Sequence, residues 1–235
     1  MKQFSLYILF ISTISIGCSA IKETSKHQME TGIYKIRNWQ NKHYCAVIED
    51  ESVALHHVSK TKAGWIADTS VALAIQLDAA NSTNRQSITF VTRSFDFDVI
   101  TILFKYRPYN SGFPNQLNTN FNGGGYIGHR SDLYILSYDK NPLNSYQRRM
   151  NHFGYSLGFF GGLGATQMNQ FVTNNNVQSE YDGVVFTKGI AGMIGIGNLT
   201  FGAAIGLDHL MDKNNRVWIY QAKAWTGFTI GLNLN

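Results

Sequence analysis

The stretch Val184–Asp208, with the sequence VVFTKGIAGMIGIGNLTFGAAIGLD, constrains the fold of this chain more than any other. It predicts two strands joined by a tight turn at Gly197-Asn198. Successive side chains on a strand point to opposite faces, so each strand has one face of mostly large apolar residues and one of small residues. The large-residue face comprises Val184, Phe186, Ile190, Ile194, Ile196, Leu199, Phe201, Ala203, Ile205 and Leu207. The small-residue face comprises Thr187, Gly189, Ala191, Gly195, Thr200, Gly202, Ala204 and Gly206.

This alternation is unusual for a soluble sheet, which sets an apolar face against a charged one. A second face of small residues is what the crowded interior of a narrow closed barrel requires. The same alternation returns over residues 153–165 and 227–234. Four strands near the C-terminus therefore share one two-faced pattern, which favours a closed antiparallel sheet.

The composition also favours an all-β fold. Charged residues make up 15% of the 235 residues, and only three prolines occur, whereas Gly, Asn, Ser, Thr and aromatic residues are abundant. Such a composition suits strands and polar turns. Outside the N-terminus no apolar run reaches the 18 or so residues of a transmembrane helix. The net charge is +5, and the Lys and Arg residues are scattered, so we expect no nucleic acid partner.

The chain divides into three predicted parts. Residues 1–20 match an export signal, because Lys2 precedes the apolar run Phe4–Ile16. Residues 21–64 predict a polar tether followed by a short β-rich segment. Residues 65–235 predict a closed antiparallel membrane β-barrel of about eight strands, a size at which side chains fill the interior.

The end of the signal carries a motif for lipid attachment. Gly17-Cys18 follows the apolar run and resembles a bacterial lipoprotein signal, which is cleaved before the cysteine that receives the lipid. Cleavage after Ala20 is the alternative. In both cases Cys45 has no cysteine left for an internal disulfide, and we expect a buried structural thiol there.

Three features within the predicted barrel lead to specific expectations. Residues 87–106 predict a long strand, or two strands bent near Ser94. Asp208 and His209 are expected at a solvated strand end. The aromatic residues Trp218, Tyr220 and Trp225 lie near predicted strand ends, where interfacial girdles occur. If residues 87–106 contain no bulge, one face of their strand comprises Asp96, Asp98, Ile100, Ile102, Phe104 and Tyr106.

Residues 87–235, about two thirds of the chain, resemble the small outer-membrane β-barrel proteins of Gram-negative bacteria. Connections are long at 166–183, two residues at 197–198 and long again at 209–216, as in those proteins. The resemblance implies a closed sheet in the bacterial outer membrane, surrounded by outer-membrane lipid, with a periplasmic C-terminus. Two features depart from it: the chain does not end on an aromatic residue, and Lys188 lies on the predicted lipid face.

Candidate catalytic and ligand-binding residues are few. His129 and Ser131 would share a strand face about 7 Å apart, and a His-x-Ser pair also occurs in outer-membrane lipid A deacylases. Spacing alone supplies neither the hydrogen bond nor the orienting partner that a nucleophile needs, and Glu180 is only a formal third member. We therefore predict no catalytic residues. No motif indicates a cofactor, and the adjacent His56-His57 pair is not a metal site, because the two rings point to opposite faces.

These patterns predict an outer-membrane protein with a structural or interaction role and no enzymatic activity. Its extracellular or cell-surface partners would bind through the loops 107–116, 166–183 and 209–216, since loops carry most contact surfaces. Two alternatives stay open. One is an outer-membrane lipid-modifying hydrolase acting through His129 and Ser131, and the other is a soluble, lipid-anchored β-barrel binding protein.

Overall fold

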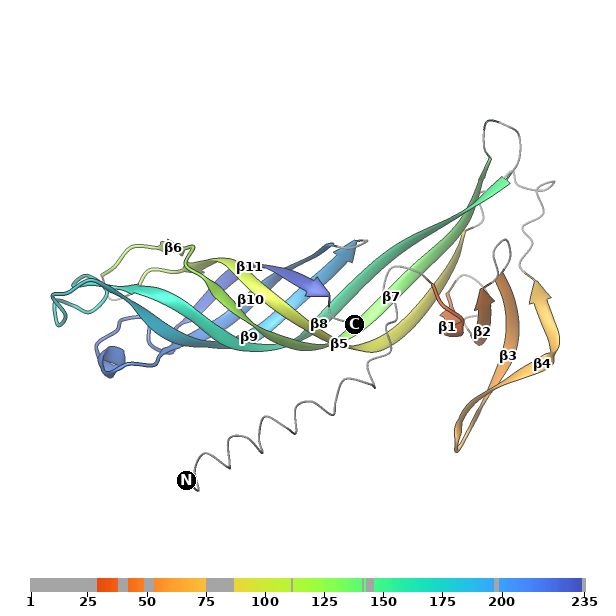
Figure 1. The fold of residues 1–235 in the computed structure, drawn as a ribbon, viewed down its shortest axis with the longest axis horizontal. Helices are drawn as coiled ribbons and strands as arrows, with labels where there is room; N and C mark the ends of the chain where they lie inside the picture. Colours follow the sequence, from red (N-terminus) through yellow and green to blue (C-terminus); the bar gives the residue numbers. More distant parts are fainter. Residues whose placement is uncertain are drawn as a thin grey trace, which may run out of the picture.

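The computed structural model describes residues 29–37, 42–48, 53–74, 87–110, 112–140, 142, 146–196 and 199–233. In these ranges the chain is all-β, and its strands pair antiparallel in one sheet (Figure 1). The predicted fold class, all-β and antiparallel, is confirmed. Among the described residues, no helix is long and apolar enough to cross a membrane. A short 3-10 helix, η2 (Lys213–Arg216), follows the penultimate strand.

Six strands pair in a ring, which we call the strand ring. Their order is β5–β7–β8–β9–β10–β11, and β11 pairs back with β5. In chain order the six are β5 (Ile88–Arg107), β7 (Asn122–Lys140), β8 (Tyr146–Met168), β9 (Tyr181–Ile196), β10 (Leu199–Leu210) and β11 (Ala224–Asn233). The short β6 (Gln116–Asn118) pairs with β5 beside the ring. The described ring thus has six strands, against an expectation of about eight.

The predicted hairpin corresponds to β9 and β10. Its register pairs Ile196 with Leu199 and Lys188 with Leu207, and it continues to the pair of Val185 with Leu210 at the end of β10. Strand β9 pairs on its other side with β8, which contains residues 153–165, the other segment with the predicted alternation. The turn residues 197 and 198 lie outside the described part of the chain.

The two faces of the strand ring differ as the alternation predicted. On β9, for example, Val184 is 53% exposed, whereas Val185 and Thr187 are fully buried. Large apolar residues cover the outer face, whereas the inner face combines small and polar residues with a smaller set of large apolar ones. The exposed large apolar side chains on the outer face are Phe95, Phe97, Val99, Leu103, Phe104, Tyr106, Ile127, Phe153, Tyr155, Leu157, Phe159, Leu163, Val184, Phe186, Ile190, Ile194 and Ile205.

Glycine is required on the inner face where neighbouring strands approach closely. A Cβ atom on Gly162 would lie 2.1 Å from the carbonyl oxygen of Gly123, and one on Gly158 would lie 2.1 Å from that of Ile127. Both distances are far inside van der Waals contact with backbone atoms, which cannot rotate away. The tight curvature of the ring therefore depends on the inward glycines.

The remaining strands form what we call the N-terminal sheet. It comprises β1 (Gly32–Ile36), β2 (His43–Ile48), β3 (Val53–Thr61) and β4 (Gly64–Ala74). β1 pairs with residues 90 and 91 of β5, so the N-terminal sheet joins the end of β5 that extends beyond the ring. All of β4 except Gly64 falls in the range 65–235 that was expected to form the barrel, and β4 pairs with β3.

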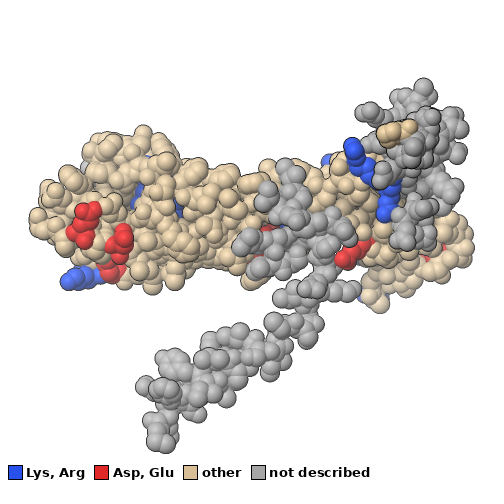
Figure 2. Space-filling model, turned by 45° about the horizontal axis from the view of Figure 1, so that its top comes forward, with Lys and Arg blue, Asp and Glu red and all other residues tan. Residues whose placement is uncertain are grey.

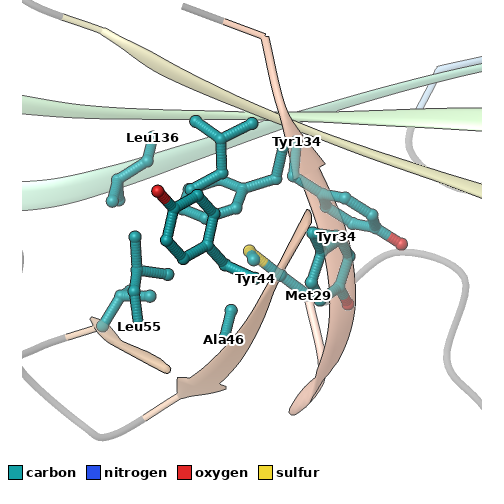
Figure 3. Packing of buried hydrophobic residues seen from close by; sticks show 10 residues of the cluster. Met29, Tyr34, Tyr44, Ala46, Leu55, Tyr134 and Leu136 are labelled. Atoms are coloured by element: carbon teal, nitrogen blue, oxygen red, sulfur yellow. The ribbon is translucent and has the colours of Figure 1, made fainter. Parts of the chain in front are cut away.

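The N-terminal sheet has a conventional apolar core, shown in Figure 3. Strands β5 and β7 contribute to this core through Phe90, Tyr134 and Leu136. The ring of Tyr34 meets those of Phe90 and Tyr134 edge-on, with centroids 6.0 and 5.9 Å apart. Burial raises the pKa of Tyr34 to about 12, while its hydroxyl donates a hydrogen bond to the Glu30 carbonyl at 2.8 Å. This core is purely apolar, whereas the interior of the ring also encloses charged side chains.

Two expectations about the N-terminal region can be placed on the structure. Cys45 on β2 is a free thiol, and it is partly buried rather than fully buried. His56 and His57 have separate partners, because the His56 Nδ1 lies 3.2 Å from the Asp68 carbonyl while the His57 ring packs against Tyr44. Residues 1–28, including Cys18, lie outside the described part of the chain.

Candidate functional site

The strand ring presents an apolar exterior and a charged interior, and both bear on function. Most of the surface of the ring visible in Figure 2 carries no charged side chain. Phe159 and Leu157, for example, are 70% and 68% exposed. Lys188 interrupts this exterior, lying between Phe186 and Ile190 on the outer face of β9. Contiguous apolar surface of this extent marks an interaction or membrane site.

The first interior cluster joins β5 to β10. Lys105 Nζ lies 2.7 Å from one carboxylate oxygen of Asp208, and Arg107 Nη2 lies 2.5 Å from the other. All three side chains are at least 96% buried. Lys105 also donates to Asn122 at 2.6 Å, and the Trp225 indole donates to Asp208 at 3.0 Å. The expectation that Asp208 sits at a solvated strand end is therefore wrong.

Aromatic rings complete this first cluster. Lys105 Nζ lies 4.6 Å from the ring centroid of Trp225. The Arg107 guanidinium lies 5.2 Å from that of Trp218 and 5.0 Å from that of Tyr220. These three aromatic residues are at most 3% exposed, so the prediction that they form an interfacial girdle is wrong. Their faces stabilise buried cations instead, because the π-electron face of an aromatic ring attracts positive charge.

A β-bulge places the two cations inside the ring. On β11, Phe228 pairs with Phe104 and Thr229 pairs with Ile102, so Leu103 has no partner. One extra residue reverses the faces of everything beyond it. Lys105 and Arg107 consequently point inward, while Phe104 and Tyr106 point outward. The predicted face holds from Asp96 to Ile102 and fails after the bulge.

The second interior cluster lies toward the N-terminal sheet. Arg130 Nε and His152 Nε2 lie 2.8 and 2.7 Å from the same oxygen of Asp132. Arg130 also approaches Asp96 on β5 at 3.9 Å. The His152 ring stacks on Tyr134 with centroids 4.7 Å apart, which links this cluster to the core of the N-terminal sheet.

Apolar side chains fill the interior between the two charged clusters. They are Ile100, Ile102, Tyr126, Phe160, Ala191, Met193, Ala204 and Trp225. Beyond the first cluster, another apolar group lies where the segments 169–180 and 211–223 meet, and the Ile219 amide donates to the Val172 carbonyl at 3.0 Å. The charged side chains of these two clusters are thus enclosed within the ring and paired with one another.

The structure does not assemble the candidate catalytic residues. His129 is exposed on the outer face, whereas Ser131 is 93% buried, and in the described part of the chain no hydrogen bond joins them. Glu180 precedes β9 and accepts a hydrogen bond from Gln167. Ser131 pairs with Tyr155 while Gln167 lies near the far end of β8, so Glu180 is remote from both. Within the described ranges, no group of three or more His, Cys, Asp and Glu side chains is placed to hold a metal.

Sequence reasoning missed the interior charges. Lys105, Arg107 and Asp208 lie near predicted strand ends, and the inward positions of the first two depend on the bulge. Arg130 and Asp132 do carry a signal, since they continue the inner face that Tyr126 and Gly128 begin on β7.

The chain was compared with family models, with curated proteins and with solved structures, and none of the three comparisons gives a match.

Proposed function

We propose that the strand ring crosses the bacterial outer membrane as a small closed β-barrel with a structural or interaction role. The main support for this proposal is that the ring exposes apolar residues and buries charged ones. Its outer face exposes large apolar side chains, while Lys105, Arg107, Asp208, Arg130 and Asp132 are buried on its inner face. Soluble monomers rarely expose apolar patches of more than a few hundred Å². Hydrocarbon around the ring would remove that surface from water and stabilise this arrangement.

The length of the apolar face supports a membrane span. On β8 the exposed apolar residues run from Phe153 to Leu163, a segment of about 11 residues, and a tilted strand crosses a bilayer with roughly 9–11 residues. On β9 they run from Val184 to Ile194. Cyclic strand pairing also supplies backbone hydrogen bonds, which hydrocarbon cannot provide. Because side chains already fill a ring of about eight strands, transport through six strands is not proposed.

The two ends of the ring suggest an orientation. Strands β9 and β10 are separated only by residues 197 and 198, at the end from which the N-terminal sheet extends. The other end carries long connections. Outer-membrane barrels keep short turns in the periplasm and longer loops outside. The N-terminal sheet would then be periplasmic, on the side where a lipid on Cys18 would anchor the chain.

Partners would bind at the opposite end, through the loops 107–116, 166–183 and 209–216. Three apolar side chains in these loops are exposed by more than 60%: Tyr109, Phe171 and Met211. Hydrolysis by His129 and Ser131 is not proposed, since one residue faces outward and the other is buried. Outer-membrane lipid is the partner that the outer face of the ring requires.

Fractionation and gel mobility test the proposal. The full chain, expressed in a Gram-negative host, should stay in the membrane pellet after washing with carbonate and with urea. Unboiled protein in detergent should migrate differently from boiled protein, because a folded membrane barrel resists unfolding in the gel. Release by carbonate with unchanged mobility would instead mean a soluble β-protein whose exposed apolar face binds another protein.

A further inference from the structure

The outer face of the ring contains an apolar groove with one charged lining residue, Lys188. We call it the Lys188 groove. It has a volume of about 430 Å³, within the range of ligand sites. Three adjacent strands, β8, β9 and β10, contribute to it. Its lining residues include Phe159, Lys188, Ile190, Ile205 and Leu207. All but Lys188 are apolar or glycine, so the groove suits a hydrocarbon chain.

A glycine on the outer face explains the space beside Lys188. Lys188 pairs with Leu207 on β10 and with Gly161 on β8, and the missing side chain of Gly161 would point outward. A Cβ atom there would meet only Phe186, at 3.9 Å. Lys188 therefore lies beside a depression in the outer face, which large side chains cover elsewhere.

Among the described residues, the charge of Lys188 has no acidic partner. The side chain is exposed, and in the part of the chain that the structure describes no acidic residue pairs with it. A lysine on the lipid face destabilises a barrel, and the effect is largest near the bilayer midplane. Its flexible stem lets the ammonium group move toward the headgroup region, where an anion can pair with it. Charge complementarity with Lys188 thus indicates an anionic ligand. The apolar lining indicates that most of the length of this ligand is apolar.

We propose that the Lys188 groove binds an anionic phospholipid, with the headgroup phosphate at Lys188 and an acyl chain along Phe159, Ile190 and Ile205. This inference rests on the proposed membrane span of the ring. It goes further, because it distinguishes one lipid site from the rest of the outer face. A zwitterionic phospholipid would offer the same acyl chain without net charge, and it would bind there less well.

Lipid retention tests the site. The full chain is placed in detergent micelles that contain equal, limiting amounts of phosphatidylglycerol and phosphatidylcholine, then repurified, and its bound lipid is quantified by mass spectrometry. The native protein should retain phosphatidylglycerol about fivefold over phosphatidylcholine, since one lysine near an anionic lipid contributes roughly 1 kcal/mol. Lys188→Met should bring the ratio close to one, and Lys188→Arg should preserve it.

Two further variants separate charge from shape. Lys223→Met, which removes an exposed lysine outside the groove, should leave the preference unchanged. Leu207→Trp should lower the total lipid retained by filling the groove. The inference is overturned if the native protein shows no preference, or if Lys188→Met retains the same ratio as the native protein. The heat-dependent gel shift is measured on the same samples, so loss of the barrel in all of them would overturn the proposed function separately.

Discussion

Replacing Gly162 with alanine should strongly destabilise the ring, whereas replacing its neighbour Gly161 should not. The two glycines are adjacent on β8 but point to opposite faces. A Cβ atom on Gly162 would lie 2.1 Å from Gly123 O, 2.5 Å from Gly124 Cα and 2.8 Å from Gly123 C. All three neighbours are backbone atoms of β7. A Cβ atom on Gly161 would have one neighbour, the tip of the Phe186 ring at 3.9 Å.

The expected magnitudes follow from these contacts. Overpacking a tight interior costs about 1–3 kcal/mol when side chains can adjust. At Gly162 the strand itself must move, so Gly162→Ala should lower the free energy of unfolding by about 3 kcal/mol or more. Gly161→Ala should leave it unchanged or raise it by roughly 0.5–1 kcal/mol, because alanine has less backbone freedom to lose on folding.

Both variants can be measured in one assay. The native protein and each variant are folded in the same detergent and titrated with guanidinium, and the folded fraction is followed by the gel shift between unboiled and boiled samples. The midpoint should fall clearly for Gly162→Ala and stay in place for Gly161→Ala. Equal midpoints for the two variants, or the reverse order, would refute the assignment of the inner and outer faces of β8.

Further predictions concern the lipid face, the interior, the N-terminal sheet and the signal. Ile205→Arg should destabilise membrane insertion by about 2–4 kcal/mol if Ile205 lies near the midplane, measured by folding into vesicles; an unaffected folding yield would count against a lipid-facing Ile205. Asp208→Asn should cost about 3–5 kcal/mol in denaturant unfolding, because it leaves two buried cations without their anion. The pKa of Tyr34 is raised to about 12, so the stability it contributes is complete below pH 10 and is lost as the pH rises through about 12. Tyr34→Phe should therefore reduce alkaline unfolding, followed by circular dichroism. Fatty acid labelling should mark the native protein and not Cys18→Ala, and equal labelling would reject lipid attachment at Cys18.

The alternation of residue size was sufficient to predict the strands and their faces. Val184–Asp208 forms the expected hairpin, and residues 153–165 form part of β8 with the expected faces. The physical reason is local, because a pleated strand places every second side chain on the same side. An alternation of residue type with a period of two therefore gives two distinct faces in any sheet. Glycine on the small-residue face also indicates close approach of neighbouring strands, whichever strands those prove to be.

The interior charges could not be predicted, because their positions depend on contacts between distant segments. One unpaired residue, Leu103, reverses the faces of β5 and carries Lys105 and Arg107 into the ring. A bulge depends on how two paired strands match in curvature. The sequence of one strand therefore does not reveal where its bulge will lie. Trp218 illustrates the same limit: its place near a strand end suggested an interface, but Arg107 lies over its ring inside the protein.

The sequence by itself thus determined that this chain is all-β, with strands that are large and apolar on one face and small on the other. Tertiary structure alone decided that six strands pair in a ring, that β4 pairs with β3, and which charged side chains are enclosed. The difference has a physical cause. Face alternation follows from the backbone geometry of one strand, whereas ring closure and the pairing of Lys105 with Asp208 depend on segments about a hundred residues apart.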